Sequence, residues 1–207
     1  TKMLDSMENA CGLKGLGYFE SCTYRELSSN KEVHTPADLK GMKVRVMQSN
    51  LHIAIWESLG AIPSAIAFGE LYTALSQGTV DAQDNPLELV ISQKFYEVQK
   101  YITLTNHIFQ VGMATCNPAW FNSLSAEDQQ VVMDAIRAGV EFQRKEAAAQ
   151  KENYITTLED AGLTVITLTD AELAEFQALM GSAEDVIATN VGADLVAELK
   201  DSIKAVS

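Results

Sequence analysis

The sequence predicts an α/β fold, and three of its features carry that prediction. Residues 38–86 give the order strand, helix, strand, helix, strand, which indicates parallel strands joined by right-handed crossovers. A helical pattern without proline runs from residue 125 to residue 162. The hydrophobic content of 47% is ordinary for a folded domain. We therefore expect a parallel-rich sheet flanked by helices, together with one long helix.

The first half of the chain carries clear start and stop signals. Residues 13–20 read as a strand after a glycine turn, and Pro36 opens a helical turn. Residues 43–46 alternate Lys or Arg with Val, which is typical of a half-buried strand. Helical spacing follows over residues 51–59 and ends at Gly60. A second strand near residues 61–67 and a helix before residue 78 complete the repeat.

Strands and helices also alternate beyond residue 80. We expect a strand ending at Asn85, a helix over 86–93, and strands over 101–105 and 109–116. The apolar residues between 108 and 114 predict that the last of these strands is buried. Capping-box patterns begin at Ser125 and Thr169. The remaining predicted elements are a strand over 163–168 and helices interrupted near residues 181 and 192.

Three side chains fall at the carboxyl ends of the predicted strands, where open α/β sheets collect ligands. They are Arg45, Phe68 and Asn85. Arginine suits bidentate recognition of a carboxylate, although a structural salt bridge from Arg45 to Glu70 or Asp81 is an open alternative. Phe68 is either a pocket wall or a core aromatic, whereas Trp56 is expected in the core.

The charge balance limits the partners. A net charge of −13 over 207 residues argues against nucleic acid and anionic membranes as partners. An acidic protein that binds an anion must concentrate its positive charge locally, which draws attention to its four arginines: Arg25, Arg45, Arg137 and Arg144. No apolar run reaches the length of a membrane span, and no signal-peptide pattern opens the sequence.

No motif of enzyme, metal or cofactor chemistry is present. Gly-x-Ser-x-Gly, His-Glu-x-x-His and the phosphate-binding glycine-lysine loop are absent, and the glycines at 12–17 are wrongly spaced for a dinucleotide. The acidic residues Asp81, Asp84 and Glu88 fit a helix start better than a metal site. We expect no catalytic residue, no metal and no cofactor. A disulfide between Cys11 and Cys22 is left open.

The sequence of residues 38–46, 59–63 and 68–86 resembles that of the solute-binding subunits of tripartite ATP-independent periplasmic (TRAP) transporters of the DctP type. The resemblance extends to residues 17–31 and 95–101, with Ala82 and Asp84 where glycine and glutamate are usual. It implies that Arg45 grips a substrate carboxylate, that Asn85 hydrogen-bonds the ligand and that Phe68 packs on it. Arg25 matches a second binding-site arginine, although a solvated pair with Glu26 is the alternative.

The resemblance also implies an architecture. It is a periplasmic-binding-protein-like (type II) fold whose second, carboxylate-binding lobe spans 23–110 and 151–207, with first-lobe pieces at 1–22 and 111–150 and most of the first lobe missing. We accordingly expect the carboxy-terminal portion of a longer periplasmic protein. It would capture a small organic acid, such as a dicarboxylate or a sialic acid-like ligand, by hinge closure, and deliver it to a membrane permease without chemistry.

Other interpretations remain beside this one. A sensor domain of the same fold is an alternative, and an enzyme on this scaffold would need His52 as its base near Arg45. Without the first lobe, the apolar segment 108–140 should either mediate self-association or retain a cleaved amino-terminal lobe.

Overall fold

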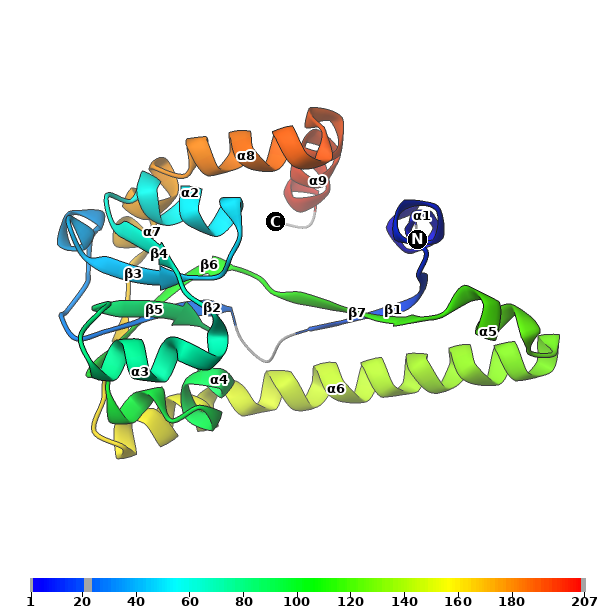
Figure 1. Ribbon diagram of the computed structural model, residues 1–207, viewed down its shortest axis with the longest axis horizontal. Helices are drawn as coiled ribbons and strands as arrows, with labels where there is room; N and C mark the ends of the chain where they lie inside the picture. The colour runs from blue at the N-terminus through cyan, green and yellow to red at the C-terminus, as the bar shows by residue number, and fades with distance from the viewer. Residues whose placement is uncertain (1, 21–23, 206–207) are drawn as a thin grey trace. The chain divides into compact units, whose positions relative to one another are not determined.

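A computed structural model describes residues 2–20 and 24–205 and divides the chain into two compact units (Figure 1). Unit 1 holds Thr1–Arg25, Pro86–Glu88 and Asn106–Thr157, and unit 2 holds Glu26–Asn85, Leu89–Thr105 and Leu158–Ser207. The chain therefore passes between the units several times, inside strands and a helix as well as in loops. The lobe boundaries expected from the resemblance stay a prediction.

Unit 2 is built on a six-stranded sheet with the order β4-β3-β5-β2-β6-β8. The pairs β3 with β4, β3 with β5 and β6 with β8 are parallel, whereas β2 pairs antiparallel with β5. The predicted α/β class is confirmed, with a mixed sheet. Its strands are β2 (Arg25–Ser29), β3 (Lys43–Val46), β4 (Ile62–Ala65), β5 (Ala82–Asn85), β6 (Tyr101–Ile108) and β8 (Thr164–Thr167).

Helices cover both faces of this sheet. The connection from β3 to β4 moves outward and that from β4 to β5 moves back, so right-handed crossovers place α2 (Asn50–Ser58) and α3 (Leu71–Ser76) on opposite faces (Figure 1). Helix α8 (Gly181–Val191) packs against α2. The other helical elements are η1 (Pro36–Leu39), η2 (Phe68–Glu70), α4 (Leu87–Ser92), η3 (Phe95–Glu97), α7 (Asp170–Ala178) and α9 (Ala193–Lys204).

The turn chemistry read from the sequence is confirmed in unit 2. Gly60 follows α2 with φ 84°, a backbone conformation that glycine adopts without steric cost. Thr169 caps α7, because its hydroxyl accepts from the Glu172 N–H while the Glu172 carboxylate accepts from the Thr169 N–H. The core of the unit contains Trp56, as predicted, along with Leu27, Val44, Leu71, Ile102 and Leu158.

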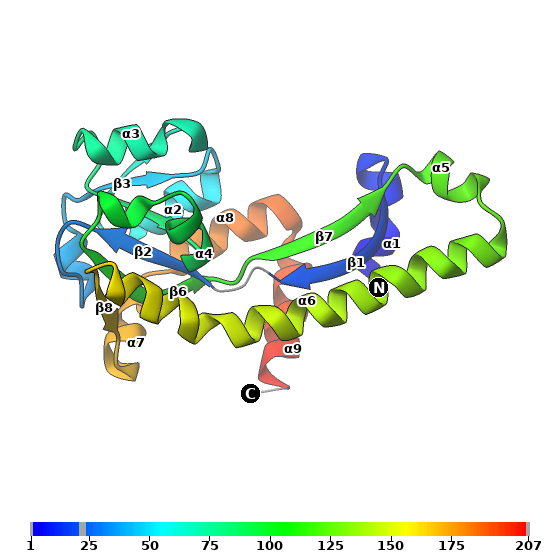
Figure 2. The same cartoon turned by 90° about the horizontal axis from the view of Figure 1, so that it is seen from below.

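Unit 1 consists of a two-stranded ribbon and the helices around it. Strands β1 (Lys14–Glu20) and β7 (Val111–Cys116) pair antiparallel, from Lys14 opposite Cys116 to Glu20 opposite Val111. The predicted long helix is confirmed as α6 (Ala126–Asp160), 35 residues that run alongside the ribbon (Figure 2). Helix α1 (Lys2–Cys11) precedes β1 in the chain, and helix α5 (Pro118–Ser123) follows β7.

Two glycines let these helices approach the ribbon. A Cβ built on Gly15 would lie 3.1 Å from the Cα of Leu4 in α1, and one on Gly17 would lie 3.1 Å from the Cγ2 of Ile136 in α6. Neither glycine has a positive φ. They are therefore required by space rather than by backbone conformation.

The expectation of a buried strand over 108–114 is wrong. Strand β7 alternates between half-buried and exposed positions, with Val111 47% and Met113 43% exposed. In the described residues β7 pairs with β1 alone, so one face of the ribbon faces helices and the other faces water. Apolar content predicted the strand correctly but not its burial.

Candidate functional site

Arg45 is a buried cation near the end of β3. Its side chain is on the central part of the unit 2 sheet and is only 2% exposed. The Nε–H donates to the carbonyl oxygen of Ile66 at 2.9 Å, just beyond β4. This hydrogen bond fixes the orientation of the guanidinium plane. A guanidinium held in one orientation can donate two parallel N–H bonds to a carboxylate.

Phe68 lies beside this guanidinium. The Cζ of Arg45 is 5.8 Å from the centre of the Phe68 ring, within the range of a cation–π interaction. Phe68 contacts Phe95 edge to face, with ring centres 6.2 Å apart, and it remains 42% exposed. It is thus held on one side and open on another, which fits a pocket wall better than a core aromatic.

Tyr72 lies in α3, four residues after Phe68. Its hydroxyl donates to Glu97 Oε2 at 2.7 Å, and this bond to the carboxylate raises the pKa of Tyr72.

Asn85 ends a strand in which every residue is buried. Strand β5 reads Ala-Gln-Asp-Asn, and Asn85 is 2% exposed. Its Nδ2 donates to Gln83 Oε1 at 2.5 Å. The register pairs Arg45 with Gln83 across β3 and β5. Because direct cross-strand partners share a face and side chains two residues apart do too, Arg45, Gln83 and Asn85 project from one face of the sheet.

Arg25 belongs to unit 1. Its Nη1 donates to Gln110 Oε1 at 3.2 Å. Arg25 is 2% exposed and Glu26 is 1% exposed, so the alternative of a solvated surface pair is wrong.

His52 and Asp84 form a separate buried pair in unit 2. The Nδ1 of His52 lies 3.5 Å from Asp84 Oδ2. Asp84 follows Gln83 along β5 and therefore points to the opposite face of the sheet from Arg45. The base that an enzyme interpretation requires is thus placed on the wrong side of the sheet.

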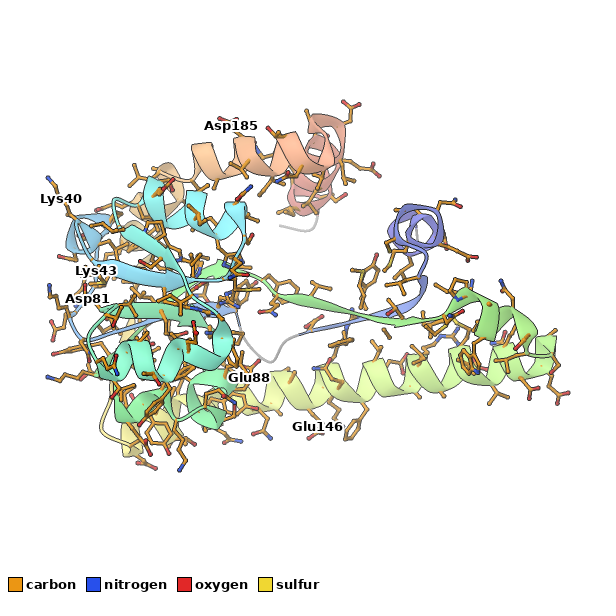
Figure 3. The ribbon with its side chains drawn as sticks, viewed as in Figure 1. Lys40, Lys43, Asp81, Glu88, Glu146 and Asp185 are labelled. Carbon is orange, nitrogen blue, oxygen red and sulfur yellow. The ribbon has the colours of Figure 1, made fainter. Side chains whose placement is uncertain are left out.

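Asp81 lies at the other end of the strands. Its Oδ2 accepts from the backbone N–H of Lys43, the first residue of β3, at 2.9 Å (Figure 3). Across residues 2–20 and 24–205, no three His, Cys, Asp or Glu side chains gather as a metal site would need. Cys11 and Cys116 form no disulfide with each other, and Cys22 lies outside the described residues, so its pairing with Cys11 stays untested. None of the described helices is long and apolar enough to cross a membrane.

Sequence reasoning missed the polar residues behind Asn85. Gln83, Ser28 and Gln99 are buried and hydrogen-bonded to one another. Their signal was available, since polar side chains in strands flanked by apolar ones must find partners when buried. The partners themselves come from β2 and from the loop before β6, which only the sheet order brings together.

Comparison with known proteins places the chain. The family model described as bacterial extracellular solute-binding protein, family 7 (DctP) matches residues 1–189. The chain belongs to this family. It is thus a DctP-type chain, as its resemblance to TRAP solute-binding subunits implied.

Several relatives of this DctP-type chain have informative names. The 2,3-diketo-L-gulonate-binding periplasmic protein YiaO of Escherichia coli is 38% identical over 187 residues, covering 89% of this chain and 57% of that protein. A TRAP periplasmic solute-binding protein of Ochrobactrum anthropi has a TM-score of 0.91 at 32% identity, covering 99% of this chain and 64% of the other. The sugar acid binding protein of Advenella mimigardefordensis, in complex with galactonate, has a TM-score of 0.90 at 31% identity, covering 100% and 66%.

The chain is shorter than its relatives. It spans 46%, 57% and 51% of three curated relatives that it matches. Family 7 proteins are described as extracellular solute-binding proteins, and two of the relatives named above, YiaO and the Ochrobactrum anthropi protein, are called periplasmic.

Proposed function

We propose that this chain carries the carboxylate-binding part of a TRAP solute-binding subunit that captures a small organic acid in the periplasm and delivers it to a membrane permease. The observation that carries the proposal is the buried Arg45 near the carboxyl end of β3. A guanidinium held by Ile66 and flanked by an open aromatic ring is suited to one carboxylate.

The other residues have supporting roles in this proposal. Phe68 packs on the apolar part of the ligand, and Asn85 supplies a hydrogen bond. Arg25 is the second arginine that we assign to ligand binding, as the resemblance implied. The named ligands of two relatives, 2,3-diketo-L-gulonate and galactonate, favour a sugar acid as the first ligand to test.

No chemistry is assigned to the bound acid. The one candidate base, His52, pairs with Asp84 across the sheet from Arg45, which supports binding without catalysis. Self-association through 108–140 also remains a proposal, supported by the exposed side chains of Phe109, Val111, Met113 and Val131. Sedimentation velocity tests it, because a 22.6 kDa monomer at all concentrations would contradict it.

The proposed function is tested by thermal unfolding with galactonate and, as a matched control, with galactitol, the neutral polyol without a carboxylate. A ligand at a hundred times its Kd stabilises the folded state by about 2.7 kcal/mol. We expect a concentration-dependent rise in Tm with galactonate, 2,3-diketo-L-gulonate or succinate and none with galactitol. Equal shifts with acid and polyol, or no shift with any of the three acids, would contradict carboxylate capture.

A further inference from the structure

A polar row crosses the buried centre of the unit 2 sheet. The register pairs Arg45 of β3 with Gln83 of β5, and Gln83 with Ser28 of β2. All three are buried, with Gln83 and Ser28 at 0% exposure. Direct partners share a face, so the row projects on the side that carries Asn85. Buried polar side chains in the middle of a sheet are retained only when their hydrogen bonds are satisfied.

The hydrogen bonds of this row run in a single direction. Asn85 Nδ2 donates to Gln83 Oε1 at 2.5 Å, and Gln83 Nε2 donates to Ser28 Oγ at 2.7 Å. Ser28 Oγ then donates to Gln99 Oε1 at 3.2 Å, and Gln99 Nε2 donates to the carbonyl oxygen of Val98 at 3.0 Å. We call these four side chains, Asn85, Gln83, Ser28 and Gln99, the amide relay.

The backbone end of the amide relay fixes every orientation in it. A carbonyl oxygen can only accept, so Val98 requires the Nε2 side of the Gln99 amide and turns its Oε1 toward Ser28. The Ser28 hydroxyl donates there and therefore accepts from Gln83. The Gln83 Oε1 is left to accept from Asn85. Reversing any one amide would place two donors or two acceptors face to face inside the sheet.

We propose that Gln83 is a positioning residue of the binding site, which acts with Ser28 and Gln99 to hold the Asn85 amide in one orientation before ligand arrives. Glutamine at position 83 offers an acceptor to Asn85 and a donor to Ser28 at this reach, whereas Met offers no donor and only a weak acceptor, and an ionised Glu offers two acceptors. Holding a ligand-contacting group in place beforehand removes part of the ordering cost of binding. The contact of Asn85 with ligand rests on the proposed function.

The first test needs no ligand. In the 207-residue chain, NMR of the Asn85 carboxamide protons should give slow exchange with water in the wild type. Ser28→Ala removes one neutral hydrogen bond two links away and should speed that exchange by about fivefold, which is the equivalent of about 1 kcal/mol. Gln83→Met should speed it further.

The matched control is Thr103→Val. Thr103 is also fully buried in this sheet, and its Oγ1 donates to the Val33 carbonyl oxygen at 3.0 Å, outside the relay. The control should lower the stability without changing Asn85 exchange relative to backbone amides of the same sheet. Equal acceleration by Thr103→Val and Ser28→Ala, or no acceleration by Gln83→Met, would overturn the relay.

The second test measures galactonate affinity in a double-mutant cycle. Gln83→Met should weaken binding by about fivefold in the wild-type background and have no effect on affinity in the Asn85→Ala background. It should also lower Tm less in the Asn85→Ala background, because the hydrogen bond between Asn85 and Gln83 is already absent there. An equal affinity loss in both backgrounds would overturn positioning through Asn85. If Arg45→Lys weakens binding and Gln83→Met does not, the inference fails and the proposed function stands. If Arg45→Lys does not change the affinity, or galactonate does not bind, the proposed function loses its support. The exchange rate of the Asn85 carboxamide protons alone then tests whether the amide relay exists.

Discussion

Strand β5 of unit 2 and strand β7 of unit 1 invert the usual relation between polarity and burial. β5 reads Ala-Gln-Asp-Asn and all four residues are buried, whereas β7 reads Val-Gly-Met-Ala-Thr-Cys and alternates with exposed positions. The difference is in their neighbours. β5 lies between β3 and β2 in a six-stranded sheet, and β7 pairs with β1 alone in the described chain. The number of strands and helices that pack against a strand sets the burial of that strand. Polar residues at buried positions then indicate a binding site.

The largest effect expected from this difference is on stability. Leu27→Ala in β2, where the side chain is fully buried, should cost about 2 to 5 kcal/mol. Met113→Ala in β7, 43% exposed, should cost less than about 1 kcal/mol at dilutions where the chain is a monomer. Urea unfolding with hydrogen exchange in each unit measures both. A comparable loss at Met113 would mean that another molecule covers β7, as the self-association proposal requires.

An intermediate effect is expected from the acidic caps of unit 2. The backbone N–H groups of His34 and Thr35 hold the pKa of Asp38 below its usual value of about 4. The backbone N–H and the hydroxyl of Thr169 likewise lower the pKa of Glu172. A lowered folded pKa gives stability that is present above the unfolded pKa and is lost as pH falls through the folded one. Unit 2 should therefore loosen at η1 and α7 below about pH 4.

The variants Asp38→Asn and Glu172→Gln check that pH dependence. Each should lower stability at neutral pH and flatten its decline in acid, as followed by urea midpoints between neutral pH and pH 3. Asp134→Asn, in an exposed pair with Arg137 on α6, serves as the control in unit 1. An unchanged acid slope in both cap variants would show that these carboxylates do not set the pH response of unit 2.

The smallest effect concerns two residues with positive φ, one in each unit. Lys94 of unit 2 has φ 57° and Asn106 of unit 1 has φ 46°. Asparagine tolerates this region better than lysine. Lys94→Asn should stabilise by about 0.5 kcal/mol and Asn106→Lys should destabilise by at least as much. Chemical denaturation of the two variants measures both changes in the free energy of unfolding. Destabilisation by Lys94→Asn as well as by Asn106→Lys would mean that side-chain contacts outweigh the backbone preference.

The fold of unit 2 could be predicted from the sequence more completely than the candidate site could. Gly60, Thr169 and the alternation of residues 43–46 are local signals, and local signals were enough for strands, helices and their ends. The placement of Arg45 near a strand's carboxyl end was confirmed for the same reason. The amide relay could not be derived, because Ser28, Gln83 and Gln99 meet only through the strand order. The burial of β7 was mispredicted because it depends on neighbours that the segment itself does not encode.

The central claim is that Arg45 anchors a carboxylate, and one titration tests it most directly. Galactonate binding is followed by NMR or calorimetry for wild type and Arg45→Lys, with Arg137→Lys on exposed α6 as the matched control. Lysine keeps the charge but loses the planar fork, and a lost charge-assisted bond costs about 1.5 to 3 kcal/mol. We predict that Arg45→Lys weakens binding by more than about tenfold with Tm nearly unchanged, and that Arg137→Lys binds as the wild type does. Unaltered affinity in Arg45→Lys would contradict the account.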